Sequence, residues 1–473
     1  MTRRQLAALS VLCLAVFMVA VDGTVVSVAV PAITEQLRPT YNQVLWIGDI
    51  YSFVLAGLLI TMGNVGDRIG RKRLLLIASV AFGVASAAAA TAPTATALIA
   101  ARAVQGVAGA GLMPSTLALL RAVFTDDRQR MRAVGIWSAA GAAGAAFGPT
   151  VAGVLLEHFY WGAVLLVNLP VVVLILAIGF WALPEARSGT LHPLDPLSVA
   201  LSTAGILGVV YGITELAHSG LGFRPAYAGL AGGALLLTVF MGRQRRLRVP
   251  LLDLSLFGQR RFTAAIVAEL VIVFAAIGSL FFLPIFLRQV GGFSALQSGL
   301  ATLPESVVSL AAAAGTARLI GAWGHRRTLL TGLAVGAAGL ITLGLTIPLS
   351  YPAMVVALML LGFSFGSTVT AAADLVLTSA SADRVGAATG ISETAFELGT
   401  ALGIALTGSL VSVFYTLISG RPATFTGSVD GGAFTDSLAL NCLIVGAALA
   451  VVTWFIGRAV PNPAPASAGR ATR

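Results

Sequence analysis

The sequence has few charged residues, and this scarcity excludes most classes of soluble protein. Charged side chains make up 10% of the 473 residues, whereas apolar side chains make up 57%. A water-soluble domain carries about 25% charged residues, which it needs to cover its surface. A soluble enzyme, a secreted mini-protein and a disordered tail are therefore excluded, and the composition indicates an integral membrane protein.

Cysteine and histidine are also scarce, which argues against two common kinds of site. The two cysteines, Cys13 and Cys442, lie far apart in apolar stretches, so they predict neither a disulfide nor a metal framework. The four histidines lie in or beside loops, and the sequence lacks the motifs of metalloproteases and of P-loop nucleotide-binding proteins. We expect no enzyme activity, no metal and no bound cofactor.

Positive charge predominates, and membrane topology explains it better than nucleic acid does. The net charge is +10, from 29 Lys and Arg against 19 Asp and Glu. The basic residues lie in short loops without interleaved aromatic residues, so no nucleic-acid partner is expected. If the N-terminus is cytoplasmic, only four basic residues lie in outside loops: Arg38, Arg224, Arg288 and Arg421. This asymmetry predicts that both termini are cytoplasmic.

Apolar runs long enough to cross a bilayer recur along the chain. Each needs about 20 residues and must satisfy its own backbone polar groups, so each is predicted to be a helix. We predict spans near 6–30, 44–66, 74–92, 95–118, 132–155, 162–183, 194–216, 225–242, 263–287, 297–318, 328–348, 352–376, 386–415 and 436–458. The predicted fold class is an all-α integral membrane protein with 14 transmembrane helices.

The sequence repeats itself at an offset near 255 residues. Residues 70–76 resemble residues 324–330. Three glycines of the fifth span recur in the thirteenth, so that Gly144, Gly148 and Gly153 correspond to Gly399, Gly403 and Gly408. The offset maps spans 1–6 onto spans 9–14 and leaves spans 7 and 8 as an inserted pair. Two such halves facing each other are typical of a transporter with a central cavity.

This repeat predicts the domain organisation. We expect an N-terminal six-helix bundle over 1–190 and inserted helices 7 and 8 over 191–250. A C-terminal six-helix bundle follows over 251–460, and a disordered cytoplasmic tail over 461–473. A single lysine, Lys72, together with abundant Ala and Gly, suggests a GC-rich bacterial genome. We therefore expect the protein in the inner membrane of a bacterial cell.

Four motifs follow one another in the order that a known family uses. They are residues 21–31 in span one, 63–73 between spans two and three, 102–106 in span four and 144–153 in span five. Together they resemble the major facilitator superfamily and, with fourteen spans, its drug:proton antiporter branch. Residues 46–52 and 392–399 resemble the quaternary-ammonium multidrug efflux pumps of that branch. The resemblance covers nearly the whole chain and implies proton-coupled export of drugs.

Acidic residues within the spans are the candidate proton and substrate sites. They are Asp22, Asp49, Glu269, Glu305, Glu393 and Glu397. An ionised carboxylate in lipid is costly, so such a residue faces a cavity or carries a proton. Glu393 and Glu397 are four residues apart and share a helical face, which favours a proton on at least one of them. The alternative for each is a carboxyl group hydrogen-bonded within the bundle.

Arg102 is the one basic residue well inside a span, and it must find partners there. The resemblance implies a role in proton coupling. The alternative is a structural hub that binds backbone carbonyl groups. Gln105 lies three residues further along a similar face and is expected to share the network of Arg102.

Residues 63–73 predict a cytoplasmic gate. The candidate gate residues are Gly63, Asp67, Arg68, Gly70, Arg71, Asp126 and Asp374. The glycines allow a tight turn, and Asp67 is placed to accept from the N-terminus of a helix in the other half. Arg71 is expected to bridge Asp67 to Asp126 or Asp127. The alternative is that the motif only fixes topology.

The glycines of span five predict a close helix contact. Gly144, Gly148 and Gly153 share one stripe, and Pro149 removes a backbone donor and is expected to kink the helix. In the family that the sequence resembles, this pattern marks exporters and implies outward antiport. The expected role is to seal the outward-facing cavity against leak, and the alternative is ordinary helix packing, which is itself part of that function.

These inferences together predict a proton-coupled antiporter that exports lipophilic, often cationic drugs by alternating access. The expected partners are lipophilic cationic or neutral small molecules, protons as the coupling ion, and the lipid bilayer. The chain is expected to be a monomer. A dedicated exporter of one antibiotic or metabolite on the same fold is the alternative.

Overall fold

The structure is a computed structural model that describes residues 1–186, 195–219, 224–247, 250, 254–379, 385–422 and 430–459. Inside its helices the side chains of Asp67 and Asp127 are not described. Its helices are α1 Arg3–Leu37, α2 Tyr41–Ile69, α3 Arg71–Ala90, α4 Ala95–Val123, α5 Asp127–His158, α6 Ala163–Leu166, α7 Asn168–Ala182, α8 Pro196–Ser219, α9 Arg224–Gln244, η1 Leu254–Gly258, α10 Arg260–Phe281, α11 Leu283–Gln289, α12 Ala295–Leu300, α13 Leu303–Thr346, α14 Tyr351–Ser379, α15 Val385–Ser419 and α16 Gly431–Ala459. These ranges contain no strand, so the all-α prediction is confirmed.

Hydroxyl and carboxylate side chains fix where several helices begin. Thr2, Thr40 and Ser294 each accept a hydrogen bond from the backbone N–H three residues further on, and a glutamine completes each capping box. The side chains of Thr94 and Asp126 cap α4 and α5 in the same way, but without a capping box. The first N–H groups of a helix have no partner inside it, so these caps satisfy donors that would otherwise be unpaired.

Thirteen helical segments of the described chain are long and apolar enough to cross a membrane. One of them, Ala295–Thr346, has 52 residues. As a straight helix it would be about 78 Å long, more than twice the roughly 30 Å of hydrocarbon in a bilayer. It breaks at Gly324, where φ is 77° and ψ is 161°. The two arms lie over predicted spans ten and eleven, so the described chain has thirteen or fourteen such helices, depending on whether the arms are counted together or separately.

The internal repeat is visible in the backbone. Gly70, between α2 and α3, has a φ of 106°, and Gly324, which the repeat pairs with it, has a φ of 77°. Glycine adopts positive φ readily because it has no Cβ. The two halves therefore make the same kind of turn at corresponding positions.

Helix contacts follow the repeat as well. A Cβ added to Gly144 would lie 2.6 Å from the Phe17 carbonyl oxygen of α1, and one added to Gly399, its partner in the repeat, would lie 2.7 Å from the Leu270 carbonyl oxygen of α10. Each glycine thus brings two backbones together where a larger residue would collide. In both halves, the glycine-bearing helix packs against the first helix of its own half.

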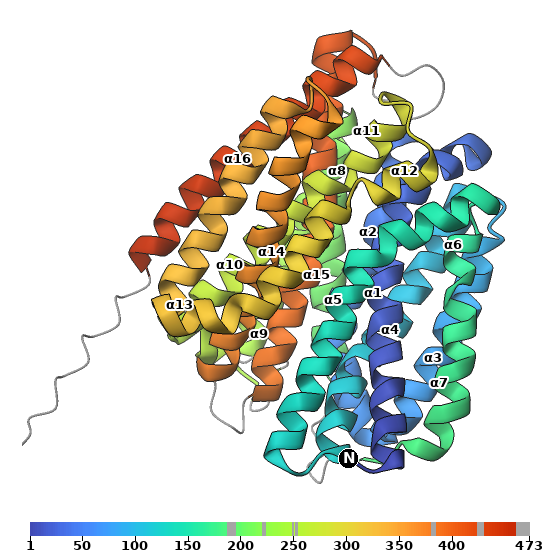
Figure 1. Cartoon of the computed structure of the whole chain (residues 1–473), viewed down its shortest axis with the longest axis vertical. Coiled ribbons are helices and arrows are strands. Elements are labelled where there is room, and N and C mark those ends of the chain that lie inside the picture. Colours follow the sequence, from blue (N-terminus) through green and yellow to red (C-terminus); the bar gives the residue numbers. More distant parts are fainter. Residues whose placement is uncertain are drawn as a thin grey trace, which may run out of the picture.

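The helices form two bundles that converge at one end and diverge at the other (Figure 1). Helices α1–α7 form one bundle and α10–α16 the other. The bundles meet where α12 packs against α5 and α11 packs against α1. They separate toward the end that carries the N-terminus (Figure 1). We call these the converging end and the diverging end.

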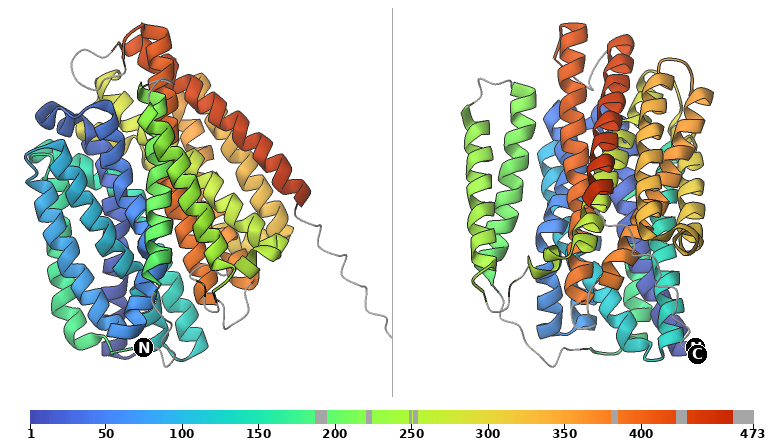
Figure 2. Two further views of the ribbon diagram at one scale, coloured as in Figure 1. Left: turned by 180° about the vertical axis from the view of Figure 1, so that it is seen from behind. Right: turned by 90° about the vertical axis from the view of Figure 1, so that its left-hand side faces the viewer.

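Helices α8 and α9 form a hairpin at the side of the two bundles (Figure 2). A Cβ added to Gly233 would lie 2.4 Å from the Val209 backbone nitrogen, so glycines bring α8 and α9 into close contact. Helix α8 packs against α2 and α15, which belong to different halves.

An ion pair joins the two helices of the hairpin near the start of α8. Arg243 Nε and Nη2 donate to Asp195 Oδ2 and Oδ1 at 3.0 and 2.9 Å. This double hydrogen bond lowers the pKa of Asp195, which lies just before α8, to about 2.

The predicted domain boundaries near residues 190 and 250 lie on or beside residues outside the description. The proposed limits of the bundles and of the inserted pair therefore stay predictions. The predicted tail over 461–473 also lies outside the described residues.

Candidate functional site

Asp22 lies at the centre of a buried hydrogen-bond network that four helices supply. Arg102 Nη1 of α4 donates to Asp22 Oδ2 in a short ion pair. Gln105 Nε2 donates to Asp22 Oδ1 at 3.1 Å, and Asn168 Nδ2 of α7 donates to the same oxygen at 2.7 Å. Ser86 Oγ of α3 accepts from Gln105 Nε2 at 2.9 Å and from Asn168 Nδ2 at 3.1 Å. All five side chains are at most 1% exposed.

Arg102 is fully buried and is held by side chains. Besides Asp22, its Nη1 donates to Gln105 Oε1 at 3.2 Å, and its guanidinium lies 4.6 Å from the centre of the Tyr51 ring on α2. An aromatic face attracts a cation, and this attraction is stronger away from water. Arg102 thus donates to a carboxylate and to an amide oxygen. As a structural hub, it was predicted to donate to backbone carbonyl groups instead.

Further hydrogen bonds support the buried ion pair. Removing two charges from water costs several kcal/mol for each ion in real proteins, and the cost is recovered only with good geometry and further hydrogen bonds. Removal of either charge would leave the other buried and unpaired. The ion pair therefore contributes to the contact between α1 and α4.

Three further candidate carboxylates lie along α10 and α15. Ser392 Oγ of α15 donates to Glu269 Oε2 of α10 at 2.5 Å. Glu393 interacts electrostatically with both Glu269 and Glu397. Glu397 hydrogen-bonds with Ser52 of α2, so this group reaches into the other half. Glu269 and Glu397 are 4% and 8% exposed.

The last two candidate carboxylates are outside these two groups. Asp49 on α2 is 2% exposed, and its Oδ1 has no hydrogen-bond partner in the described part of the chain. Glu305 lies in the first turn of α13, and its Oε2 accepts from Ser306 Oγ at 3.2 Å. The structure thus separates the six predicted carboxylates into an Asp22 network, a Glu269–Glu393–Glu397 group and two individual positions.

The span-five motif lies where the two halves meet. Gly144 and Gly148 face α1, where an added Cβ on Gly148 would lie 2.0 Å from Thr24 Oγ1. Gly153 faces α12 of the other half, where its added Cβ would lie 2.8 Å from the Ala295 carbonyl oxygen. Pro149 lies inside a continuous α5. The motif therefore joins α1 to the converging end.

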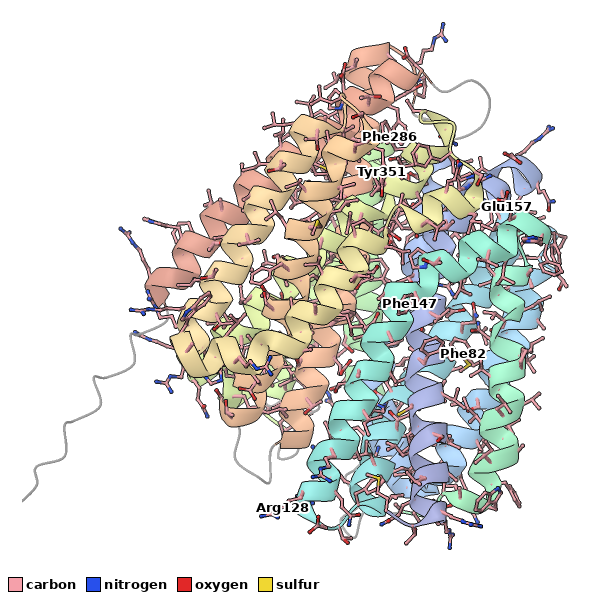
Figure 3. The ribbon with its side chains drawn as sticks, in the orientation of Figure 1. Phe82, Arg128, Phe147, Glu157, Phe286 and Tyr351 are labelled. Carbon is pink, nitrogen blue, oxygen red and sulfur yellow. The ribbon has the colours of Figure 1, made fainter. Side chains whose placement is uncertain are left out.

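A cluster of charge crosses between the halves at the converging end. Arg288 of α11 interacts electrostatically with Glu35 of α1 and Glu157 of α5. Glu157 also accepts a hydrogen bond from the Leu296 backbone N–H at 3.4 Å. Figure 3 shows Glu157 at this end of α5 and Arg128 at the opposite end. Arg288 was predicted to lie in an outside loop, and neither glutamate was among the predicted site residues.

The predicted gate residues lie toward the diverging end. Gly70 has a φ of 106° at the turn between α2 and α3. The backbone N–H of Arg71 donates to the Ala186 carbonyl oxygen at 2.9 Å, and the Arg71 side chain lies over Gly66. Asp126 accepts from the Gln129 backbone N–H at 2.9 Å, as the cap of α5. The side chains of Asp67 and Asp127 lie outside the description, so the bridge through Arg71 stays a prediction.

Asp374 has a partner from the neighbouring helix. Its Oδ2 lies 2.6 Å from Nε2 of His325. His325 is the residue directly after the break at Gly324. The repeat pairs His325 with Arg71, so both turns place a basic side chain at the start of the next arm. Gly63 lies within α2, where an added Cβ would be 3.9 Å from Pro114 of α4.

Comparison with known proteins identifies the family. The sequence matches the Major Facilitator Superfamily over residues 12–404, with a second match over 306–471. The chain belongs to this superfamily. It is 42% identical over 434 residues to the multidrug efflux pump LfrA of Mycolicibacterium smegmatis, covering 91% of this chain and 85% of that protein. It is 35% identical over 421 residues to the methyl viologen resistance protein SmvA of Salmonella typhimurium, covering 89% and 85% of the two chains.

A solved structure has the same fold. The crystal structure of a bacterial homolog to the human lysosomal transporter Spinster, in an inward-facing and unoccupied conformation, superposes with a TM-score of 0.67. It is 16% identical and covers 97% of each chain. At this identity the likeness shows the fold alone. The fold and the membership in the major facilitator superfamily agree, and the protein is a multi-pass membrane protein.

Two polar residues of the Asp22 network were not among the site residues predicted from the sequence. Ser86 and Asn168 lie in apolar spans and belong to none of the four motifs. Asn168 follows directly on the break between α6 and α7. An asparagine within an apolar span is costly unless it is hydrogen-bonded, and this cost was the available signal.

Proposed function

We propose that the protein exports lipophilic, often cationic drugs from the cytoplasm in exchange for protons, by alternating access. The observation that carries this proposal is the buried ion pair between Asp22 and Arg102, completed by Gln105 and Asn168. A carboxylate at this depth is a site that a proton can neutralise. The printed names of the relatives, a multidrug efflux pump and a resistance protein for methyl viologen, support drug export.

The contacts of α1 provide a route from proton binding to conformation. Helix α1 carries Asp22 and packs against α5 along the glycine motif. Helix α5 in turn packs against α12 of the other half. When a proton neutralises Asp22, the attraction between α1 and α4 weakens, and α1 can shift against α5. Because the exchanged proton enters from outside, this shift closes the converging contact at Gly153 and makes the cavity accessible from the cytoplasm.

The substrate is proposed to contact the carboxylates that lie between the halves. Glu397 of α15 is hydrogen-bonded to Ser52 of α2, so both halves contribute to its surroundings. Glu393 lies one turn away, and Asp49 has an oxygen without a partner in the described chain. A lipophilic cation would neutralise such a carboxylate, and a proton would displace the cation. Competition for the same negative charge produces exchange.

The arrangement of the two halves fits a drug-free carrier whose cavity is open to the cytoplasm. The halves diverge toward the end with the N-terminus (Figure 1). The excess of Lys and Arg in the loops of this end supports a cytoplasmic location for it. We assign the diverging end to the cytoplasm of a bacterial cell and the structure to an inward-facing state.

The number of protons determines how steep a gradient the pump sustains. Exchange of one monovalent cation for one proton moves no net charge, so only the pH gradient drives it, at about 1.4 kcal/mol per pH unit. A second proton adds the membrane potential, about 2.3 kcal/mol per 100 mV. The Asp22 network and the Glu393–Glu397 pair are two separate sites, and they give the protein the capacity for two protons.

A transport assay with Asp22→Asn tests the proposal. The purified protein is reconstituted in liposomes, and accumulation of an ethidium-type dye is measured under an imposed pH gradient. The asparagine keeps the size of the side chain but cannot carry a proton, so we expect dye accumulation to fall at least tenfold. The matched control is Asp436→Asn, which changes an exposed carboxylate on α16. Normal accumulation by Asp22→Asn, or wild-type accumulation without any proton gradient, would contradict the proposal.

A further inference from the structure

Tyr51 on α2 lies between the two groups of carboxylates. Its ring faces the Arg102 guanidinium at 4.6 Å. Its hydroxyl is within electrostatic range of Asp22 of α1 and also of Glu397 of α15. Asp22 belongs to one half of the molecule and Glu397 to the other. Tyr51 is thus a residue through which the two buried sites of the proposed exchange can influence each other.

The hydroxyl of Tyr51 has an unused hydrogen-bonding capacity. Tyr51 is 2% exposed, and its hydroxyl has no hydrogen-bond partner within the described ranges. It lies against α4, where a Cβ added to Gly109 would be 3.1 Å away. A buried hydroxyl without a partner costs about 1–3 kcal/mol, and such groups are rare in folded proteins. An unpaired donor here calls for an explanation.

The neighbouring residue shows how α2 divides its contacts. Ser52 hydrogen-bonds with Glu397 on the α15 side, whereas Tyr51 contacts Arg102 on the α4 side. Near the converging end, the Tyr41 hydroxyl donates to the Gly408 carbonyl oxygen at 2.6 Å, so α2 stays in contact with α15 over several turns. A small movement of α2 between α4 and α15 changes the distance from the Tyr51 hydroxyl to each carboxylate.

We propose that Tyr51 is a positioning residue that couples the two proton sites, because its hydroxyl donates to whichever of Asp22 and Glu397 is ionised. This inference rests on the proposed function. The hydroxyl has one proton to donate, so it can stabilise only one of the two carboxylates at a time. Ionisation of one site then favours the protonated form of the other, and the two halves load and release protons in alternation.

The charged groups around Tyr51 are consistent with this role. They are Asp22 from α1, Arg102 from α4, and Glu397 with Glu393 from α15. Helix α8 also packs against α2, and its Glu215 accepts from Asn42, more than two turns away from Tyr51. Tyr51 is therefore surrounded by one cation, which its ring contacts, and by carboxylates that compete for its hydroxyl.

The substitution Tyr51→Phe tests the coupling, since it removes the hydroxyl and keeps the ring on Arg102. The full-length protein in liposomes is assayed with ethidium in two ways: accumulation driven by a pH gradient, and exchange of dye for dye at equal pH. We expect exchange to stay within about twofold of wild type and driven accumulation to fall about tenfold. A donor stabilises an ionised carboxylate, so its loss is expected to move the midpoint pH of transport upward by about one unit.

A control variant and distinct patterns of outcome make this test decisive. Tyr160→Phe removes a hydroxyl from an exposed tyrosine at the converging end and is expected to leave both assays unchanged. If Tyr51→Phe lowers exchange and accumulation equally with an unchanged midpoint pH, Tyr51 is merely structural and the inference is overturned. An unchanged midpoint and normal accumulation overturn it as well. Failure of the proposed function looks different, because wild type itself would then accumulate dye without a proton gradient.

Discussion

At the scale of single residues, the structure shows how a charge is retained in apolar surroundings. Asp22 has two oxygens, and the described contacts give Oδ2 to Arg102 and Oδ1 to Gln105 and Asn168. Each donor stabilises the ionised carboxylate. The amide donors matter because Arg102 alone would leave one oxygen unpaired at a position with 0% exposure.

Asn168→Ala is predicted to make the release of a proton from Asp22 less favourable. The change removes a donor 2.7 Å from Oδ1 without changing any charge. The ionised form loses about one hydrogen bond to a charged group, or about 1.5–3 kcal/mol. We expect driven dye accumulation to fall about tenfold and its midpoint pH to rise. The measurement is the same liposome assay, repeated at a series of pH values.

A matched control separates this effect from general damage to the bundle. Ser10→Ala removes a hydroxyl that is bonded to the Leu6 carbonyl oxygen of its own helix, and we expect it to transport normally. If Asn168→Ala keeps the wild-type midpoint pH while its yield and thermal stability fall, then Asn168 supports the fold and not the carboxylate.

At the scale of helices, the sequence predicts those features that depend on one residue type. A glycine stripe indicates a close approach whichever helix lies opposite, so the role of Gly144 and Gly148 could be predicted, although α1 as their partner could not. Gly70 and Gly324 could be paired because a turn with positive φ requires glycine. The length of the apolar runs predicted the spans. The turn at Gly324 divides the segment Ala295–Thr346 into two of them.

Other features of the site depend on which face of a helix points inward, and one sequence does not determine this. Ser86 and Asn168 become important only because α3 and α7 turn them toward Asp22. Likewise, any two of Glu35, Glu157 and Arg288 are at least 122 positions apart in the sequence. Only the folded chain brings these three charges together. Their interaction comes from tertiary contact, and charge patterning along the chain carries no sign of it.

The inserted hairpin allows a prediction about stability and pH. Arg243 lowers the pKa of Asp195 from an ordinary value of 3.8 to about 2. The ionised carboxylate therefore stabilises the hairpin above about pH 4, and this contribution is lost as the pH falls toward 2. Asp195→Asn is expected to lower the melting temperature of the purified protein by roughly 2 °C at neutral pH. The difference from wild type should shrink between pH 4 and pH 2.

Arg243→Gln provides the reciprocal variant. It removes the other partner of the same double hydrogen bond, so it should show the same loss at neutral pH and the same convergence with wild type in acid. A difference from wild type that stays constant down to pH 2 would show that the ion pair does not stabilise the hairpin.

At the scale of the whole molecule, the two halves are held together by small residues at the converging end. Gly299 of α12 lies so close to α5 that an added Cβ would be 2.4 Å from the Pro149 carbonyl oxygen. Gly153 makes the reciprocal contact with the Ala295 carbonyl oxygen at 2.8 Å. Backbone atoms cannot move aside as the end of a flexible side chain can. A methyl group here is therefore compatible only with a state in which the halves have separated at this end.

Gly299→Ala is accordingly predicted to shift the protein toward the outward-open state. Spin labels at Phe159 and Leu349, two exposed positions in loops flanking the converging end, report the distance between the halves. We expect this distance to increase by several ångströms in the variant and driven dye transport to fall at least tenfold, because the carrier cannot close. Gly315→Ala, at a helical glycine with open space around it, is the control and should keep both the distance and the transport of wild type. If Gly299→Ala transports normally with an unchanged label distance, then α5 and α12 do not form the closing contact, and the energy that keeps this end closed must come mainly from the charges of Arg288, Glu35 and Glu157.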